Sequence, residues 1–241
     1  MYVVLGASGN TGKVVAETLL RQKKKVRVVL HDAAKGRAWG EAGADVAIAN
    51  VDEGATLERA FSGAEGVYVL LPPNFSSSHV RVDNNRRTHT IAAAVEAAGV
   101  PHAVLLSSIG AQQSDGTGPR DVGIAVARLL AEGGSGKRVI ELAGPREYTP
   151  RDVAAVVGRI VGKPIAVQQA PEEAMAPALM GAGMNAEWAR LFQELTHGLN
   201  ANIVVWEGGH PFWRGETEIE RVLSTLLGKV TAPAARGGSS S

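Results

Sequence analysis

A glycine-spaced turn near the start of the chain constrains its fold more than any other feature of the sequence. The segment Gly6–Gly12, GASGNTG, has glycine at every third position. It follows the apolar run Tyr2–Leu5, which is typical of a buried strand, and leads into the amphipathic stretch Thr11–Arg21, which is typical of a helix. The sequence therefore predicts a strand, a tight turn and a helix in immediate succession.

Each of the three glycines has a physical role in such a turn. Gly6 permits the tight bend, Gly9 allows phosphates to approach the backbone, and Gly12 brings the helix close to the strand. The free N–H groups and the positive dipole end of the helix suit a pyrophosphate. We interpret the segment as a dinucleotide site. The alternative is a strand-to-helix turn without a ligand, which also favours glycine.

Apolar runs and helical stretches alternate along the first half of the chain. The predicted strands are Tyr2–Leu5, Val26–Leu30, Val46–Ala49, Val67–Leu71 and Ala103–Leu106. The predicted helices between them are Thr11–Arg21, Ala34–Ala42, Ala55–Phe61 and Arg86–Ala98. The strands are almost continuously apolar, which indicates burial on both faces. This order predicts an α/β fold with a doubly wound parallel sheet.

The second half of the chain has a more helical pattern. A helix is predicted at Arg120–Glu132 and a strand at Arg138–Leu142, and Thr149 followed by Pro150 marks another helix start. Further helices are predicted at Pro171–Gly181, Ala186–His197 and Thr217–Leu227. We expect a dinucleotide-binding domain in residues 1–147, a small, mostly helical C-terminal lobe in 148–230, and a disordered tail in 231–241.

Composition excludes several classes of function for this chain of 241 residues. Its 25 basic and 24 acidic residues give a net charge of +1, so no basic field is available for nucleic acid or an anionic membrane. Cysteine is absent, which removes disulfides and thiolate chemistry, and the histidines lack metal-ligand spacing. No apolar run is long enough to span a membrane. We expect a cytoplasmic protein without a metal site.

The residues after the second predicted strand bear on which dinucleotide is bound. Asp32 follows Gly12 by about 20 residues, the spacing of an acid that holds the ribose 2′-hydroxyl of NAD. His31, Lys35 and Arg37 are cations or potential cations that suit the 2′-phosphate of NADP. We predict NADP as the cofactor and keep NAD as the alternative.

Blocks along nearly the whole chain resemble the NmrA-like group of atypical short-chain dehydrogenase/reductases. The blocks are Gly6–Gly12, His31-Asp32 with Lys35, Leu70–Pro73, Gly99–Pro101, Ser107–Ala111, Arg120–Gly123, Glu141–Pro145, and Glu207–His210 with Arg214-Gly215. The resemblance implies a Rossmann domain that binds NAD(P), usually NADP(H), and a small lobe over a substrate cleft. Some members reduce quinones or small carbonyl compounds, whereas others are redox sensors or transcriptional co-regulators.

Motif and resemblance together define the predicted cofactor contacts. They are Gly6, Ser8, Gly9, Asn10, Thr11, Gly12, His31, Lys35, Asn50, Val51, Leu71, Pro72 and Ser107.

The chain departs from the family pattern in three places. His31 stands where the family typically has Arg, and Ala49-Asn50 stands where it typically has Gly-Asp. The family also places a helix, a strand and a loop between the blocks that end near Ala111 and begin at Arg120. We therefore predict that Gln112–Arg120 is not a continuous short loop over an otherwise complete family fold, and that a segment is missing there.

The catalytic residues are not identified by the sequence. None of the three tyrosines has Lys four residues later, so the usual Tyr-x-x-x-Lys acid–base pair is absent, which also disfavours sugar-nucleotide epimerase chemistry. Ser107 ends the fifth strand and either faces the nicotinamide or caps the strand. His210, which follows Gly208-Gly209, either reaches the cleft or is a turn histidine, and we favour the turn.

The function that we predict is NAD(P)-dependent transfer of hydride between the nicotinamide and a small carbonyl or quinone substrate. The alternative is a non-catalytic redox-sensing regulator that passes cofactor occupancy to a protein partner. The missing Tyr-x-x-x-Lys pair favours the sensor, and the Gly208–Arg214 block favours a substrate cleft.

Overall fold

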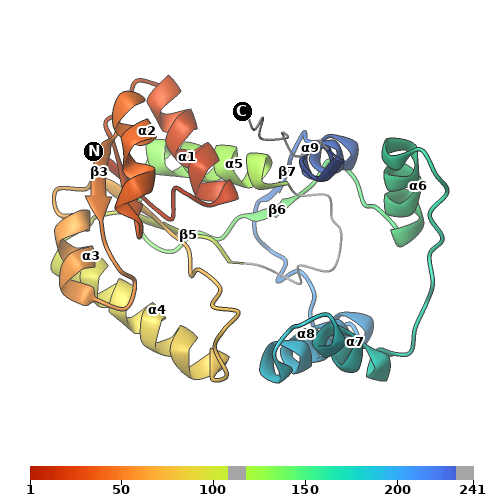
Figure 1. Ribbon diagram of the computed structural model, residues 1–241. Helices are drawn as coiled ribbons and strands as arrows, with labels where there is room; N and C mark the ends of the chain where they lie inside the picture. Colours follow the sequence, from red (N-terminus) through yellow and green to blue (C-terminus); the bar gives the residue numbers. More distant parts are fainter. Residues whose placement is uncertain (108–117, 232–241) are drawn as a thin grey trace, which may run out of the picture.

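A parallel five-stranded sheet forms the centre of the computed structural model, which describes residues 1–107 and 118–231 (Figure 1). Its strands are β1 (Tyr2–Leu5), β2 (Val26–Leu30), β3 (Asp45–Ile48), β4 (Gly66–Val69) and β5 (Ala103–Leu105). They lie in the order β3-β2-β1-β4-β5, and every neighbouring pair is parallel. This order confirms the predicted doubly wound α/β fold.

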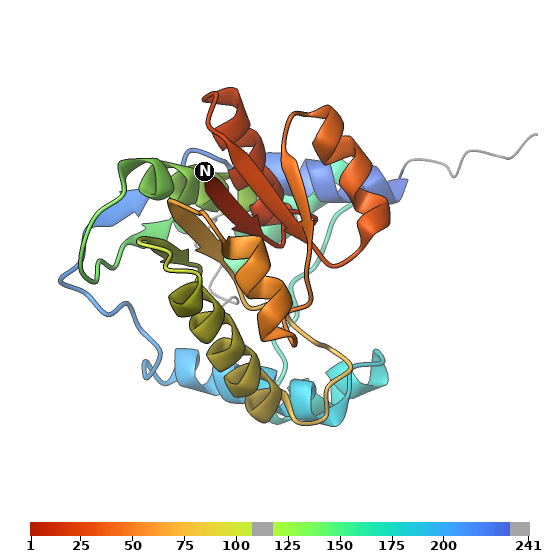
Figure 2. The same ribbon diagram turned by 90° about the vertical axis from the view of Figure 1, so that its left-hand side faces the viewer.

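Helices cover both faces of the sheet (Figures 1 and 2). Their bounds are α1 (Asn10–Arg21), α2 (Gly36–Glu41), α3 (Gly54–Phe61), α4 (Val80–Ala97) and α5 (Pro119–Glu132), with a short 3-10 helix η1 (Ala33–Lys35). Helix α4 begins six residues before the predicted start at Arg86. Its first turns are polar and carry little amphipathic pattern, which explains why the sequence did not predict them.

Alternate side chains along the strands divide the core into two layers. Val4 of β1 and Tyr68 of β4 pack with α1 and α5, including Leu19 and Leu130. On the other face, the neighbours of these strand residues pack with α3 and α4; this layer contains Val3, Leu5, Val67, Val69, Leu57, Phe61 and Ile91. Because both faces are covered, the strands are apolar at consecutive positions, as the sequence predicted.

A two-stranded parallel sheet and further helices complete the described part of the chain. Strand β6 (Glu141–Ala143) pairs with β7 (Phe212–Arg214), so β6 begins three residues after the predicted start at Arg138. The remaining elements are α6 (Pro150–Val161), η2 (Glu172–Ala174), α7 (Met175–Gly181), α8 (Ala186–Asn200) and α9 (Ile219–Thr231). Helix α6 lies beside α9, and α7 lies beside α8, so the helices after β6 form two separate pairs (Figure 1).

Close helix contacts fix α5 against α1 and the end of the chain. A Cβ at Gly123 would lie 2.6 Å from Val14 Cγ1, so only glycine permits the crossing of the two helices at this point. Asp121, two residues earlier on α5, is buried and bonded to Thr217. The blocks Arg120–Gly123 and Arg214-Gly215, far apart in sequence, thus meet in one place.

The predicted break in the family fold lies largely outside the described residues. Residues 108–117 contain most of Gln112–Arg120, so the continuity of that stretch stays a prediction. Within the described part of the chain, β5 stands at the edge of the five-stranded sheet, and Leu105 is 64% exposed. The proposed tail, 231–241, also lies almost wholly outside the described part.

Candidate cofactor-binding site

The ends of the five strands bring the predicted contacts to one edge of the sheet. The pairing register places Leu5 beside Val29, Leu30 beside Ile48, and Val69 beside Leu105. The row of residues that follows the five strand ends by one or two positions consists of Ala7, His31, Ala49, Leu71 and Ser107. The row lies at the carboxyl edge, where ligands bind in open α/β sheets.

The glycine turn between β1 and α1 is as tight as its sequence predicted. Gly6 has a positive φ of 72°, and a Cβ there would lie 3.3 Å from Leu70 Cδ2. A Cβ at Gly12 would lie 2.8 Å from the carbonyl carbon of Gly6, a distance that backbone atoms cannot relieve. Gly12 therefore holds the helix against the turn, as expected.

The N-terminus of α1 is open toward solvent. Gly9 is the N-cap and contributes no side-chain hydrogen bond, and the first turn contains no acidic residue. The next backbone N–H groups, of Asn10, Thr11 and Gly12, have no carbonyl one turn earlier in the helix. Ser8 and Asn10 are exposed beside them. This arrangement of N–H groups fits an anionic pyrophosphate.

In the turn after β2, the acidic and basic side chains have different hydrogen-bond and ion-pair partners. The Asp32 carboxylate caps η1 by accepting a hydrogen bond of 2.9 Å from the Ala34 N–H. Arg37 forms an i,i+4 ion pair with Glu41 at 2.8 Å. His31 and Lys35 are exposed, and neither has an ion-pair partner in the described part of the chain. Of the four residues considered for the ribose, these two are the least engaged with the protein.

The turn after β3 is held by hydrogen bonds from side chains within the turn and the start of α3. The Asn50 side-chain oxygen accepts from the Asp52 N–H at 3.1 Å, and its amide donates to Glu53 at 3.1 Å. The Asn50 backbone N–H donates to the Thr56 hydroxyl at 3.2 Å. Asn50 therefore shapes the turn, and Val51 is half-buried at its tip.

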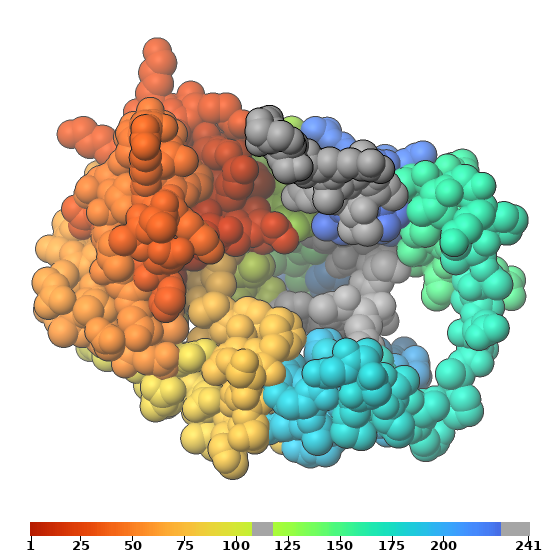
Figure 3. All heavy atoms as spheres, in the orientation of Figure 1, coloured from red at the N-terminus to blue at the C-terminus, as the bar shows by residue number. Residues whose placement is uncertain are grey.

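The loop that follows β4 carries Leu71 and Pro72 and is held by α8. The Asn185 side chain donates to the carbonyl oxygens of Phe75 at 2.7 Å and Ser77 at 3.0 Å. The Trp188 indole donates to the Asn74 carbonyl at 2.9 Å, and its ring lies 4.9 Å from that of Phe75. The space-filling view shows the α7–α8 pair against this segment (Figure 3).

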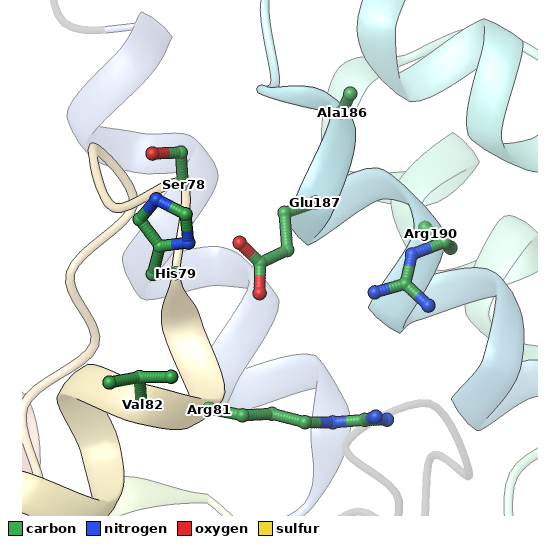
Figure 4. Close-up of a pocket in the computed structure, with 7 residues that line it drawn as sticks. All are labelled: Ser78, His79, Arg81, Val82, Ala186, Glu187 and Arg190. Atoms are coloured by element: carbon green, nitrogen blue, oxygen red, sulfur yellow. The ribbon is translucent and has the colours of Figure 1, made fainter.

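An open groove of about 450 Å³ separates the start of α4 from α8 (Figure 4). Its lining includes His79, Arg81, Glu187 and Arg190. Glu187 accepts the Val80 N–H at 3.0 Å, whereas Arg81 and Arg190 each donate to Glu194 at 2.7 Å. Arg81 and Arg190 therefore share the single Glu194 carboxylate, and the groove lies at the junction between α4 and α8.

The tyrosines do not stand at the sheet edge. Tyr68 is fully buried in β4, and burial raises the pKa of its phenol well above the usual value. Tyr148 lies beneath the Arg146 guanidinium, 4.2 Å from its ring, and its hydroxyl contacts Glu218 and accepts the Ile219 N–H. Burial, together with the hydrogen bond to Glu218, raises the pKa of Tyr148.

Two other candidates have clear positions. Ser107 is exposed at the end of β5, in the same row as His31 and Leu71, while the rest of its block lies outside the described residues. His210 follows Gly208 and Gly209, which both have positive φ, and lies 3.5 Å from Glu207 in a turn.

The sequence missed several residues that shape this edge. Arg86 and Arg87 on α4 bind Asp52 in the turn between β3 and α3. Asn185 and Trp188 on the α8 side bind carbonyl oxygens of the loop between β4 and α4. These contacts join residues far apart in the chain, and no local pattern marks them. The two adjacent arginines in the sequence of α4 were a signal that could have indicated a carboxylate partner nearby.

The residues of this site match a described protein family. The model of that family, NAD(P)H-binding, matches residues 6–141, which is more than half of the chain. The chain belongs to the NAD(P)H-binding family. This match bears out the NAD(P)-binding family that the sequence blocks indicated.

Three similar proteins extend the comparison. The NAD(P)H azoreductase of Xenophilus azovorans is 22% identical over 252 residues, covering 81% of this chain and 86% of that protein. The Citrobacter sp. triphenylmethane reductase complexed with NADP(H) gives a TM-score of 0.74 at 14% identity, covering 93% and 99% of the two chains. The NADPH-dependent quinone oxidoreductase of Escherichia coli complexed with NADPH gives 0.64 at 20%, covering 94% and 100%.

The two solved structures share the fold of this chain over the 93–94% of it that they cover. Among the described residues, no helix combines the length and apolar character needed to cross a bilayer. The same part of the chain contains no cluster of three or more His, Asp or Glu side chains able to hold a metal ion.

Proposed function

We propose that this protein is an NADPH-dependent reductase that delivers hydride to a small carbonyl or quinone compound. The observation that carries the proposal is the row formed by His31, Leu71 and Ser107 at the sheet edge, beside the open N-terminus of α1. The similarity to azo-dye, triphenylmethane and quinone reductases supports a reductase of small aromatic acceptors.

In this proposal, different residues at the sheet edge bind different parts of the cofactor. The N–H groups of Asn10, Thr11 and Gly12 hold the pyrophosphate, and Gly6 and Gly9 keep side chains away from it. Ser8 is exposed beside these groups and adds a hydroxyl for the phosphates.

The two ends of the dinucleotide lie along the row. Asn50 and Val51 border the adenine, and Leu71 and Pro72 border the nicotinamide. When bound, the nicotinamide supplies hydride chemistry. The chain orients the acceptor and excludes water, and the exposed hydroxyl of Ser107 is placed to donate a hydrogen bond to an acceptor oxygen.

A preference for NADP over NAD is part of the proposal. The Asp32 carboxylate is engaged in capping η1, which leaves it less suited to a ribose hydroxyl. His31 and Lys35 are exposed beside it; Lys35 supplies positive charge for a 2′-phosphate, and His31 supplies a ring N–H donor.

A redox sensor is the second candidate function. It is favoured by the absence of Tyr-x-x-x-Lys from the sequence and by the direct bonds from Asn185 and Trp188 to the loop after β4. Those bonds connect the cofactor edge to the α7–α8 pair, which offers a route from cofactor occupancy to a protein partner.

One experiment separates the two functions. NADPH and NADH are titrated by nicotinamide fluorescence, and their steady-state oxidation is followed with quinones, aldehydes and an azo dye. Binding with turnover of at least one acceptor supports the reductase, whereas binding without turnover supports the sensor. A chain that binds neither cofactor contradicts both.

A further inference from the structure

Two adjacent arginines of α4, Arg86 and Arg87, bind Asp52 in the turn between β3 and α3. The Arg87 guanidinium forms two parallel hydrogen bonds to Asp52, from Nε to Oδ1 at 3.0 Å and from Nη2 to Oδ2 at 2.9 Å. Arg86 adds an ion pair to Asp52 Oδ1 at 2.7 Å. The Arg87 side chain is 13% exposed, so this pair is better shielded from solvent than an ordinary surface ion pair.

This turn, between β3 and α3, is the one that we propose borders the adenine. Asp52 is two residues after Asn50, and the Asp52 N–H is bonded to the Asn50 side chain at 3.1 Å. The position of Asp52 therefore sets that of Asn50 and Val51. The Asp52 pKa is lowered, chiefly by the hydrogen bond from Arg87, so the carboxylate is charged at neutral pH and keeps this bond.

The same part of α4 also holds the loop after β4. Ser77 is buried, and its hydroxyl donates to Asp83 Oδ2 at 2.6 Å while accepting the His79 N–H at 3.0 Å. Arg86 reaches Asp83 at 3.6 Å and Asp52 at 2.7 Å. The two loops that flank the candidate cofactor edge are thus joined through the first two turns of one helix.

We propose that Arg87 is a positioning residue for the adenosine half of the cofactor. Through Asp52 it fixes the turn that carries Asn50 and Val51, without touching the cofactor itself. The planar fork of arginine satisfies both carboxylate oxygens at once, which the point charge of lysine does not. This inference rests on the proposed cofactor site and adds to it a residue that the sequence did not single out.

The matched control for Arg87 lies at the opposite edge of the sheet. Arg27 pairs with Asp45 at 2.6 Å, its side chain is 21% exposed, and it also donates to the carbonyl oxygens of Ala60 and Ser62. Its partner stands at the start of β3, whereas Asp52 follows the end of that strand. Loss of Arg27 removes a comparable interaction far from the cofactor residues.

The test compares two reduced cofactors in wild type, Arg87→Gln, Arg87→Lys and Arg27→Gln. NADPH carries the adenosine half, and reduced nicotinamide mononucleotide lacks it. We expect Arg87→Gln to weaken NADPH binding about tenfold, the order for loss of a charge-assisted hydrogen bond. Binding of the mononucleotide stays unchanged, Arg87→Lys does not restore NADPH affinity, and Arg27→Gln binds both cofactors as wild type does.

The outcomes separate this inference from the proposed function. A wild type that binds neither cofactor overturns the cofactor site and the inference with it. A wild type that binds NADPH, together with an Arg87→Gln variant of equal affinity or one that weakens both cofactors alike, overturns the inference alone. If Arg87→Gln does not fold, Asp52→Asn is measured in its place, because it keeps the backbone bond to Asn50 and is subject to the same criteria.

Discussion

Asp121 on α5 accepts two hydrogen bonds from Thr217, a residue 96 positions later in the chain. Its Oδ2 accepts the backbone N–H at 3.0 Å and its Oδ1 accepts the hydroxyl at 2.7 Å, and both side chains are buried. A Cβ at Gly215 would overlap the same carboxylate, so glycine is required there. This contact fixes the segment before α9 against the helix that packs on α1.

Removal of this carboxylate is expected to destabilise the fold. Asp121→Ala leaves two buried donors of Thr217 without partners, at a cost of about 1–3 kcal/mol each. Thr217→Val loses only the hydroxyl bond and is expected to cost about 1 kcal/mol. Urea unfolding measures both. Thr225→Val on the exposed face of α9 is the control, with an expected change below about 0.5 kcal/mol. Equal stability of Asp121→Ala and wild type would contradict the contact.

Two glycines of the first turn are expected to respond differently to substitution. A Cβ at Gly9 meets only the Gly6 carbonyl oxygen at 3.3 Å, so Gly9→Val is tolerated by the fold while its side chain covers the N–H groups of α1. We expect loss of NAD(P) binding with the circular dichroism spectrum retained. Gly12→Ala is expected to destabilise the protein itself, since its Cβ would overlap the Gly6 backbone. Tight cofactor binding by Gly9→Val would show that the pyrophosphate lies elsewhere.

The sequence predicted the elements whose signals are local. The apolar runs of β1 to β5, the glycine turn and the Thr149-Pro150 helix start each carry their own pattern within a few residues. Parallel strands end at a common edge, and His31, Leu71 and Ser107 each follow a strand end there by one or two residues. Contact of these residues with a cofactor stays a prediction.

Interactions between distant segments were beyond such reasoning. Asp121 in the first turn of a helix has an ordinary role at the positive dipole end, so nothing in its sequence context indicates a bond to Thr217. Asp52 and Arg87 are 35 residues apart and meet only when α4 packs beside α3. The three residues of β7 become a strand only by pairing with β6.

The preference for NADP is expected to depend on salt. The exposed Lys35 cation, with the exposed His31 beside it, attracts the 2′-phosphate through a screened interaction, so NADPH affinity falls faster than NADH affinity as ionic strength rises. Lys35→Gln lowers NADPH affinity and leaves NADH affinity unchanged. Arg37→Gln, whose charge is paired with Glu41, is the control and has a smaller effect. An equal salt response of the two cofactors removes the basis of the preference.

The pairing of Asp52 is expected to contribute stability that disappears in acid. The hydrogen bond from Arg87 lowers the Asp52 pKa below its ordinary value of 3.8. A carboxyl whose pKa is lower in the folded state stabilises the fold above the unfolded pKa, and this contribution is lost as pH falls through the folded pKa. Wild type is therefore more stable than Asp52→Asn at pH values near neutrality, and the difference shrinks below about pH 4. Urea unfolding at several pH values measures it, and a difference independent of pH would contradict the assignment.

The last prediction concerns the open edge of the sheet at β5. Leu105 is 64% exposed, although the family pattern places a further helix and strand after this point, and Leu130 on α5 is 1% exposed. If the sheet ends at β5, Leu105→Ala removes little buried surface and is expected to cost less than about 0.5 kcal/mol. Leu130→Ala creates a core cavity and is expected to cost about 2–5 kcal/mol. The two variants have the same change in side chain and differ strongly in burial, so denaturant unfolding compares them directly. A cost for Leu105→Ala as large as that for Leu130→Ala would mean that another part of the protein covers this strand in solution.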